Sequence, residues 1–357
     1  MNNLLRTKIL LTGGGTSGSV TPLLAIADEL NSDKYEFLWL GTKKGPELKM
    51  VEKENIKFKK IVSVKLHRYI SLYTLLYTAL APVLFLAGFI QSFFIILKFR
   101  PRWILTTGSF VSVPVVWAGF IFRKKILVHQ QDARAGLANK LMAPLANVVT
   151  VTFEKSLDDY GKEAKWTGNP MRTKVLEAKS KNFFTLKSEL PLIFIFGGGT
   201  GAEFLNKLVL DSLPELTKFC QIIHITGRSR ASAMKKGFSN YFQYEFLDYD
   251  KMIEAYKRSS LVVARSGLAT ITELSYFEKP SIIIPMPNTH QTVNATLLET
   301  ESAALILDQA VLNTDFFIKK IEDVLFDENL RKSYGKNIKK IIKRGAEKEI
   351  ANIIKNF

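Results

Sequence analysis

The side chains best suited to chemistry gather in residues 264–295. They are Arg265, Ser266, Thr270, Glu273, His290, Gln291 and Asn294. The stretch has the pattern of a strand, a tight turn at Gly267, a helix and a second strand that stops at Pro285. Anionic ligands bind at the carboxyl ends of such strands and at the adjoining helix N-termini, so we expect one here. The alternative is that the hydroxyl residues only cap the helix and that Glu273 lies on a solvated face.

Two glycine-rich turns punctuate the chain at similar places in its two halves. Residues 13–18 follow the apolar run 8–11, and residues 197–201 follow the apolar run 192–196. A helical pattern comes after each turn, which predicts two Rossmann-like halves in tandem. The first turn has dinucleotide spacing, but the next strand ends in Leu40-Gly41-Thr42-Lys43 without the acid that a nicotinamide site needs. The glycines therefore indicate a close backbone approach, or only a tight turn, and name no dinucleotide.

Other apolar runs complete the two halves. We expect strands at residues 37–40, 103–106, 126–129 and 147–151 in the first half, and at 221–225, 261–264 and 281–285 in the second. Residues 170–185 are polar and basic and have the composition of a linker. The tail from residue 315 onward has a helical pattern and ends in a lysine-rich segment.

The composition limits the partners. The 357 residues are 47% hydrophobic, which suffices for two cores, and 50 Lys and Arg against 33 Asp and Glu give a formal net charge of +17. This surplus favours nucleic acid, acidic lipid or a phosphate-bearing substrate. The lone Cys220 excludes a disulfide framework and a cysteine zinc cluster. We expect no signal peptide, since the first apolar run is short. No aromatic residues interleave with the lysine run Lys336, Lys339, Lys340 and Lys343, so we expect no nucleic-acid partner.

Residues 70–97 contain no charged residue. Their length would permit a transmembrane helix, but Pro82 and Gly88 interrupt the stretch and both flanks are basic. We expect a broken helical hairpin that lies in the interface of an anionic leaflet. A buried pair of core helices and a true span are the alternatives. Elsewhere, Asp248-Tyr249-Asp250 has the D-x-D pattern of some metal sites, but it is also a common turn tripeptide, and we expect no metal.

Five motifs stand in the order of one family: Gly14-Gly15-Thr16-Ser17-Gly18, His129-Gln130-Gln131-Asp132 with residues 136–140, residues 167–172, the second glycine turn and residues 265–295. Together they resemble the MurG family of lipid I N-acetylglucosaminyltransferases. The resemblance covers residues 9 to about 304. It implies an α/β fold of the GT-B type, with two Rossmann-like domains facing a cleft. Residues 1–168 would bind the acceptor and the membrane, residues 169–335 would bind the donor, and residues 336–357 would form a helix packing back on the first domain.

The resemblance also implies roles for individual residues, with UDP-N-acetylglucosamine as donor and no cofactor or metal. Glu273 would bind the ribose hydroxyls, and Leu247 would lie against the uracil. The diphosphate would be held by the helix start formed by Leu268, Ala269, Thr270, Ile271 and Thr272. Gln291 and Asn294 would hold the sugar, and Arg172 and Gly199 match donor-contacting positions. The first-domain loop of Thr16, Ser17 and Gly18 would approach the lipid diphosphate of the acceptor or the transferred sugar. Asp132 and Asn139 are further substrate-binding positions.

Three departures from the family pattern concern catalysis. Ser19 stands where the family has a histidine that is a favoured catalytic candidate, and a serine is no base near neutral pH without a partner. The family's HEQN is His129-Gln130-Gln131-Asp132 here, and Gly199 replaces a usual serine. Asp132 thus brings a new carboxylate, which we expect to act as the base or to support His129 in that role. The alternative for His129 is a structural histidine at a strand end.

The implied reaction is an inverting transfer of N-acetylglucosamine to the C4 hydroxyl of the N-acetylmuramyl unit of lipid I, which gives lipid II for peptidoglycan. The protein would be peripheral, on the cytoplasmic face of an anionic cell membrane. Three other functions stay open: a glycolipid glycosyltransferase acting on diacylglycerol, a UDP-N-acetylglucosamine 2-epimerase, and a weakened UDP-sugar-binding subunit.

Overall fold

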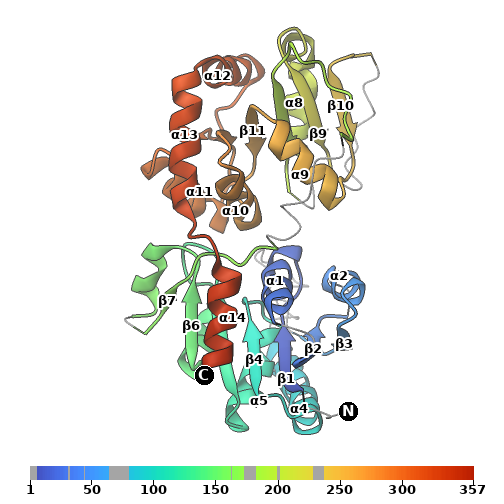
Figure 1. The fold of residues 1–357 in the computed structure, drawn as a ribbon, viewed down its shortest axis with the longest axis vertical. Coiled ribbons are helices and arrows are strands. Elements are labelled where there is room, and N and C mark those ends of the chain that lie inside the picture. The colour runs from blue at the N-terminus through green and yellow to red at the C-terminus, as the bar shows by residue number, and fades with distance from the viewer. Residues whose placement is uncertain are drawn as a thin grey trace. The chain divides into compact units, whose positions relative to one another are not determined.

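The computed structural model describes residues 6–30, 33–43, 45–63, 80–161, 163–172, 182–198, 202–227 and 237–357. The chain forms two compact units (Figure 1). The first unit is Met1–Thr173 together with Lys343–Phe357, and the second is Lys174–Ile342. The last segment of the chain therefore returns to the first unit.

The first unit is built on a seven-stranded parallel sheet in the order β3-β2-β1-β4-β5-β6-β7. Its strands are β1 (Thr7–Thr12), β2 (Tyr35–Gly41), β3 (Lys57–Lys60), β4 (Trp103–Thr106), β5 (Lys125–Gln130), β6 (Val148–Val151) and β7 (Lys165–Trp166). The order reverses between β1 and β4, so the loops after these strands lie at the point where α/β sheets usually bind ligands.

Helices cover both faces of this sheet. They are α1 (Thr21–Glu29), α2 (Glu47–Lys53), α4 (Ala81–Phe99), α5 (Ser112–Ile121), α6 (Leu137–Met142) and α14 (Ala346–Asn356), with the short 3-10 turns η1 (Ser17–Ser19), η2 (Ala143–Leu145) and η3 (Glu154–Asp159). Alternate strand residues face opposite sides. Ile9 and Leu11 pack with the helices α1, α2 and α14, whereas Leu10 packs with α4, α5 and α6.

The second unit repeats the plan with a six-stranded parallel sheet in the order β10-β9-β8-β11-β12-β13. Its strands are β8 (Leu192–Phe196), β9 (Gln221–Ile225), β10 (Tyr241–Tyr244), β11 (Leu261–Ala264), β12 (Ser281–Ile283) and β13 (Leu305–Ile306). The order again reverses beside the unit's first strand. The predicted tandem of Rossmann-like halves is confirmed.

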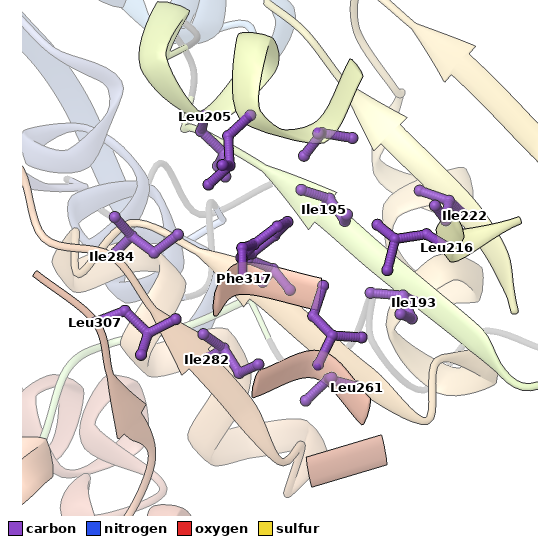
Figure 2. Packing of buried hydrophobic residues seen from close by; sticks show 14 of the residues in the cluster. Ile193, Ile195, Leu205, Leu216, Ile222, Leu261, Ile282, Ile284, Leu307 and Phe317 are labelled. Carbon is purple, nitrogen blue, oxygen red and sulfur yellow. The ribbon is translucent and has the colours of Figure 1, made fainter. Parts of the chain in front are cut away.

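The helices of the second unit are α8 (Glu203–Leu216), α9 (Tyr249–Arg258), α10 (Leu268–Phe277), α11 (His290–Thr300), α12 (Thr314–Phe326) and α13 (Glu328–Ile341). Figure 2 shows one face of the sheet, where Ile193, Ile195 and Ile222 meet Leu205 and Leu216 of α8 and Phe317 of α12. On the opposite face, Phe194 and Phe196 contact the ring of Tyr256 from α9.

The expected interruption of the apolar stretch is wrong over its described part. Helix α4 runs without a break from Ala81 to Phe99, because Pro82 lies in its first turn, where no amide donor is needed. Gly88 faces inward, and a Cβ there would collide with the Val62 carbonyl oxygen, so this glycine permits close packing. Residues 70–79 of the predicted hairpin lie outside the described residues.

The first unit extends beyond residue 168. Arg172 donates hydrogen bonds to Asp28 and Glu54, and the Met171 amide donates to Glu347 at 3.4 Å. Gly168, at φ +85°, packs against the Lys343 carbonyl so closely that a Cβ would collide with it. These contacts hold residues 168–172 in the first unit, so the expected boundary after residue 168 is too early.

The lysine-rich tail is divided between the units. Helix α13 stays in the second unit, where Gly335 lies so near α10 that a Cβ would be 2.7 Å from the Glu278 carbonyl oxygen. The tail then breaks at Ile342, which is extended, and at Gly345, which has φ +84°. The segment that returns therefore begins at Lys343 and not at Lys336, and its helix is α14, which packs on α1 (Figure 1).

Candidate functional site

The structure brings the predicted polar stretch of the second unit together. The turn after β11 leads into α10, whose N-cap is Gly267 and whose first turn has no side-chain cap. Next to it, the Ser266 hydroxyl donates to the Gln291 carbonyl at 2.8 Å, and the Asn294 side chain donates to the Ser266 carbonyl at 3.2 Å. The start of α11 is thus fixed against the start of α10. An uncapped helix N-terminus presents backbone N–H groups and a partial positive charge, which suits a diphosphate.

Glu273 lies within α10, and Tyr256 of α9 holds its carboxylate. The Tyr256 hydroxyl donates to Glu273 Oε2 at 2.7 Å. Burial raises the pKa of Glu273 to about 7, and the hydrogen bond from Tyr256 opposes that rise. Tyr256 itself is buried and stacks on Phe277 with 5.1 Å between ring centroids. The sequence alone gave no sign of Tyr256, because its partner belongs to another helix.

Three predicted donor-side residues have structural hydrogen bonds. Arg265 donates to the carbonyls of Ile284 at 2.8 Å and Pro285 at 2.9 Å, and to Gln309 Oε1 at 2.7 Å. It therefore ties β11 to the segments after β12 and β13. Gln291 Oε1 accepts the Met286 amide at 3.1 Å. The Asn294 side chain is buried and holds Ser266, as described above.

The remaining donor-side predictions differ in exposure. Ala269 is exposed at the helix start, whereas Leu268, Thr270, Ile271 and Thr272 are buried, and the Thr272 hydroxyl donates back to the Leu268 carbonyl at 2.8 Å. These four residues can offer backbone groups more readily than side chains. Leu247 is also buried, just before α9. Gly199 lies outside the described residues.

On the first unit, the predicted acceptor loop is fixed from several sides. The Gly14 carbonyl accepts the Ser109 hydroxyl at 2.9 Å, and the Gly13 carbonyl accepts Trp39 Nε1 at 3.0 Å. Thr16 and Ser17 are exposed, and Gly18 is half-buried. The loop is therefore fixed at Gly13 and Gly14, and its residues 16–18 face outward.

Ser19 belongs to the fixed part of the loop. Its hydroxyl lies 3.2 Å from the Gly14 carbonyl oxygen and 3.1 Å from the Thr16 carbonyl oxygen, and the Thr107 hydroxyl donates to its carbonyl at 2.7 Å. The side chain is buried. A hydroxyl that closes its own loop does not face a substrate, so the structure argues against a catalytic role for Ser19.

The segment after β5 lies against the same loop. The side chain of Gln131 donates to the Gly18 carbonyl at 2.9 Å, and that of Gln130 donates to the carbonyls of Asp132 at 2.7 Å and Arg134 at 2.8 Å. A glutamate at position 130 could not donate these two hydrogen bonds, which explains why a glutamine stands there. Asp132 is half-buried and directly follows Gln131, which contacts the acceptor loop.

Asn139 completes this network. Its amide donates to Gln130 Oε1 at 2.7 Å, whereas its Oδ1 is buried and accepts no hydrogen bond from the described residues. The hydrogen bonds of Gln130 could not be predicted from the sequence, in which the only sign was a glutamine in place of the family's acid.

His129 fits the structural alternative. The ring is fully buried, with Nδ1 2.9 Å from the Thr150 hydroxyl and Nε2 3.3 Å from Asn169 Oδ1. The Thr152 hydroxyl also lies 3.2 Å from Nε2, so both ring nitrogens have hydrogen-bond partners within the protein. Burial lowers the pKa of His129 to about 4, although the bond to Asn169 opposes this. A neutral, enclosed ring with both nitrogens occupied cannot act as the base in this structure.

The match of Arg172 to a donor-contacting arginine is not supported by its surroundings. Its guanidinium donates to Asp28 at 2.6 and 3.3 Å and to Glu54 at 2.7 and 3.0 Å. Paired forks of this kind are among the stronger ionic contacts. Arg172 thus anchors the end of the first unit and has few donors left for a ligand.

Two further features involve residues outside the predicted donor and acceptor sets. A groove of about 520 Å³ lies between α13 and the amino ends of β11 and β12, at the opposite edge from the α10 start, and its lining includes Lys279 and Lys336. Lys279 donates to the carbonyls of Lys257 at 3.0 Å and Ser259 at 2.8 Å, so it closes the end of α9. Asp248 caps α9 by accepting the Lys251 amide at 3.0 Å, which explains the D-x-D tripeptide as a helix start.

Comparison with known families gives two matches in the same chain. Residues 9–151 match the glycosyltransferase family 28 N-terminal domain, and residues 192–354 match the glycosyltransferase family 28 C-terminal domain.

Curated relatives match over the full length. A Clostridium tetani protein is 32% identical over 99% of both chains, and a Clostridium botulinum protein is 33% identical over 98% of this chain and 99% of its own. Each is named "UDP-N-acetylglucosamine--N-acetylmuramyl-(pentapeptide) pyrophosphoryl-undecaprenol N-acetylglucosamine transferase".

Solved structures agree on the fold. Acinetobacter baumannii MurG superimposes with a TM-score of 0.77 at 21% identity, over 99% of this chain and 100% of that one. The calicheamicin glycosyltransferase CalG4 gives 0.77 at 10% identity over 99% and 98% of the two chains, and a Neisseria meningitidis UDP-GlcNAc 2-epimerase gives 0.69 at 13% identity over 98% and 100%. The chain therefore has the GT-B fold and belongs to glycosyltransferase family 28, as a MurG-like member.

Proposed function

We propose that this protein transfers N-acetylglucosamine from UDP-N-acetylglucosamine to the C4 hydroxyl of the N-acetylmuramyl unit of lipid I, giving lipid II for peptidoglycan synthesis. The observation that carries the proposal is the end-to-end match, over both units, to relatives of that name. The arrangement of residues 264–295 supports the donor side of the reaction.

The second unit would bind the donor. The carboxylate of Glu273 would accept hydrogen bonds from the ribose hydroxyls, and the uncapped start of α10 would hold the diphosphate. As the bond from the anomeric carbon to UDP breaks, negative charge grows on the diphosphate. Backbone N–H groups and the helix dipole are aimed at that charge without reorganisation, so they stabilise the transition state more than the ground state.

The first unit would bind the acceptor and supply the base. The acceptor hydroxyl attacks the anomeric carbon while its proton passes to a carboxylate, in a single displacement that inverts the anomeric centre. Asp132 is our candidate for that carboxylate, because it is half-buried and follows the loop-contacting Gln131, while His129 and Ser19 are enclosed. Residues 16–18 would contact the diphosphate of the lipid or the transferred sugar.

The lipid acceptor requires a membrane-binding surface, and an exposed apolar surface on the first unit supports this part of the proposal. Helix α4 is long and apolar enough to cross a membrane by length and composition, with a mean hydropathy of 1.9, but one side of it packs on α5. Its exposed side is a stripe of large apolar residues, which continues onto α5 and α6: Val83, Leu86, Ile90, Phe94, Leu97, Trp117, Phe120, Ile121, Leu137 and Leu141. We name these residues the apolar ridge.

Basic residues border the apolar ridge, among them Lys98, Arg100 and Lys140. An apolar surface with basic neighbours fits peripheral binding to the cytoplasmic face of an anionic membrane. Helix α4 would then lie in the interface with its exposed side toward the lipid and its other side on α5.

In the decisive experiment, the purified full-length protein is incubated with labelled UDP-N-acetylglucosamine as the donor. A lipid I analogue and diacylglycerol are present together as competing acceptors. We expect label in the lipid I analogue. Label in diacylglycerol would instead indicate a glycolipid glycosyltransferase. Epimerised sugar nucleotide without any acceptor would indicate the epimerase, whose fold is shared. Tight donor binding without turnover would indicate a binding subunit.

A further inference from the structure

A buried carboxylate lies inside the first glycine-rich loop. Glu47, the first residue of α2, has 0% of its surface exposed. Its Oε1 accepts the Thr42 amide at 2.8 Å and also the Thr42 hydroxyl, and its Oε2 accepts the Gly15 amide at 3.2 Å. Taking a carboxylate out of water is costly unless such donors replace the water, so these contacts account for its burial.

The glycines around Glu47 make room for this side chain. A Cβ on Gly14 or on Gly45 would collide with the carboxyl group of Glu47. Gly15 has φ +84°, a conformation that residues with a side chain rarely adopt, and its amide donates to Oε2. The close approach that the glycine spacing indicates is therefore satisfied within the chain. A ligand phosphate is not needed at the Gly15 amide, because Glu47 already occupies that position.

The same arrangement determines which part of the loop remains available. Gly13 and Gly14 are buried, while Gly15, Thr16 and Ser17 are exposed. Glu47 holds the loop at the Gly15 amide. Gln131 holds it at the Gly18 carbonyl, which accepts a hydrogen bond from Gln131 Nε2 at 2.9 Å. Residues 16–18 lie between these two anchors.

We propose that Glu47 is a positioning residue that supplies the first glycine-rich loop with an internal carboxylate and so presents residues 16–18 to the acceptor. The role rests on the proposed function for its substrate, since residues 16–18 are the predicted acceptor contacts. Its structural part, that Glu47 fixes the loop, stands on the hydrogen bonds alone.

The test variant is Glu47→Gln, which keeps the shape of the side chain. Its amide oxygen can still accept from Thr42, but its NH₂ group would face the Gly15 amide, so donor would meet donor. The matched control is Glu254→Gln in the second unit. Glu254 is also buried and accepts two backbone amides, from Phe183 at 2.8 Å and from Phe184 at 3.4 Å.

The first measurement is hydrogen–deuterium exchange of the full-length proteins. We expect amides of residues 13–19 to exchange at least tenfold faster in Glu47→Gln than in the wild type, and to be unchanged in Glu254→Gln. Tenfold corresponds to about 1.4 kcal/mol, close to the smallest values for a hydrogen bond to a charged group. Equal exchange in wild type and Glu47→Gln would overturn the proposal.

The second measurement is steady-state transfer to the lipid I analogue. We expect Glu47→Gln to raise the acceptor KM about tenfold while the donor KM stays within twofold, and Glu254→Gln to leave the acceptor KM unchanged. Added formate should lower the acceptor KM of Glu47→Ala toward the wild-type value, because it can replace the missing carboxylate at the exposed Gly15. A KM effect shared equally by donor and acceptor, or by the control, would reject acceptor positioning.

The two measurements separate the proposals. If the wild type transfers no sugar to any acceptor, the proposed function fails, and the exchange rates still decide whether Glu47 holds the loop. If the wild type is active and the loop loosens without a change in acceptor KM, the function stands and the positioning role is wrong.

Discussion

Asp132 is the carboxylate whose loss should affect chemistry most. It is half-buried on the segment that Gln130 and Gln131 hold against the acceptor loop. Since general-base catalysis contributes roughly 10²–10⁴-fold, we expect Asp132→Asn to lower kcat at least a hundredfold with an unchanged donor KM. Asp158→Asn, which removes an exposed aspartate from the same unit, should leave both parameters unchanged. Wild-type turnover of Asp132→Asn with intact donor binding would assign the base elsewhere.

Tyr256 should control how donor binding depends on pH. The proposed contact of Glu273 with the ribose hydroxyls requires its carboxylate form. Burial raises the pKa of Glu273 to about 7, so donor kcat/KM should fall as the pH drops below 7. The Tyr256 hydroxyl lowers that pKa, so Tyr256→Phe should raise it and move the acid limb to higher pH.

We expect donor kcat/KM at pH 7 to fall on the order of tenfold in Tyr256→Phe, the cost of one hydrogen bond to a charged group. Tyr334→Phe, on α13 of the same unit, is the control. A profile that falls uniformly at every pH would indicate a structural effect of Tyr256 and no control over Glu273.

Single residues were predictable where their role follows from their place on one element. The start of α10 and Glu273 could be inferred because the strand, turn and helix are contiguous in the sequence. Tyr256 and Glu47 could not, since each acts through a partner on another element. His129 is a third case: the sequence allows a base or a buried histidine, and only tertiary packing decides between them.

At the scale of elements, the exposed stripe of α4 should govern membrane binding. Phe94 is 63% exposed on the apolar ridge, and Phe326, on α12 of the other unit, is 61% exposed. Burying one such ring contributes about 1.5–3 kcal/mol, so Phe94→Glu should weaken binding to phosphatidylglycerol vesicles about tenfold or more. Phe326→Glu should bind vesicles like the wild type in the same co-sedimentation assay. Equal losses in both variants would exclude the apolar ridge as the membrane surface.

Strand prediction succeeded best in the buried centre of the sheets. The expected runs 103–106, 221–225 and 261–264 coincide with β4, β9 and β11, because central parallel strands are continuously apolar. The edge strand β3 was not predicted, since its sequence KFKK is mostly solvated lysine. The expected strand 281–285 ends at Ile283 as β12, and Pro285 has no amide to extend it.

At the scale of the whole molecule, the last helix should stabilise the first unit. Ile350 of α14 is buried in the core of β1 and α1, whereas Ile338 of α13 is buried in the second unit. Truncating either should cost about 2–5 kcal/mol. The two unfolding transitions can be told apart by calorimetry with and without UDP-N-acetylglucosamine. Ile350→Ala should lower the midpoint temperature of the transition that the donor does not stabilise, and Ile338→Ala should lower that of the transition that the donor stabilises. The reverse pattern would contradict the division of the tail.

The tandem of two halves was predictable from the repeated glycine turns. The return of the last helix to the first unit was implied only by the resemblance. Periodicity shows that residues 346–356 are helical without showing which core they enter. That depends on contacts such as Ile350 with β1 and α1, which are distant in sequence.

The return of α14 also has a consequence for a chain cut between residues 173 and 181. The downstream fragment would carry the second unit and, at its end, one helix of the first. The upstream fragment would lack the helix that covers Ile9 and Leu11. The two fragments should therefore recognise each other and co-purify when expressed from separate genes, and a nick at this point should leave the protein in one piece until denaturant is added.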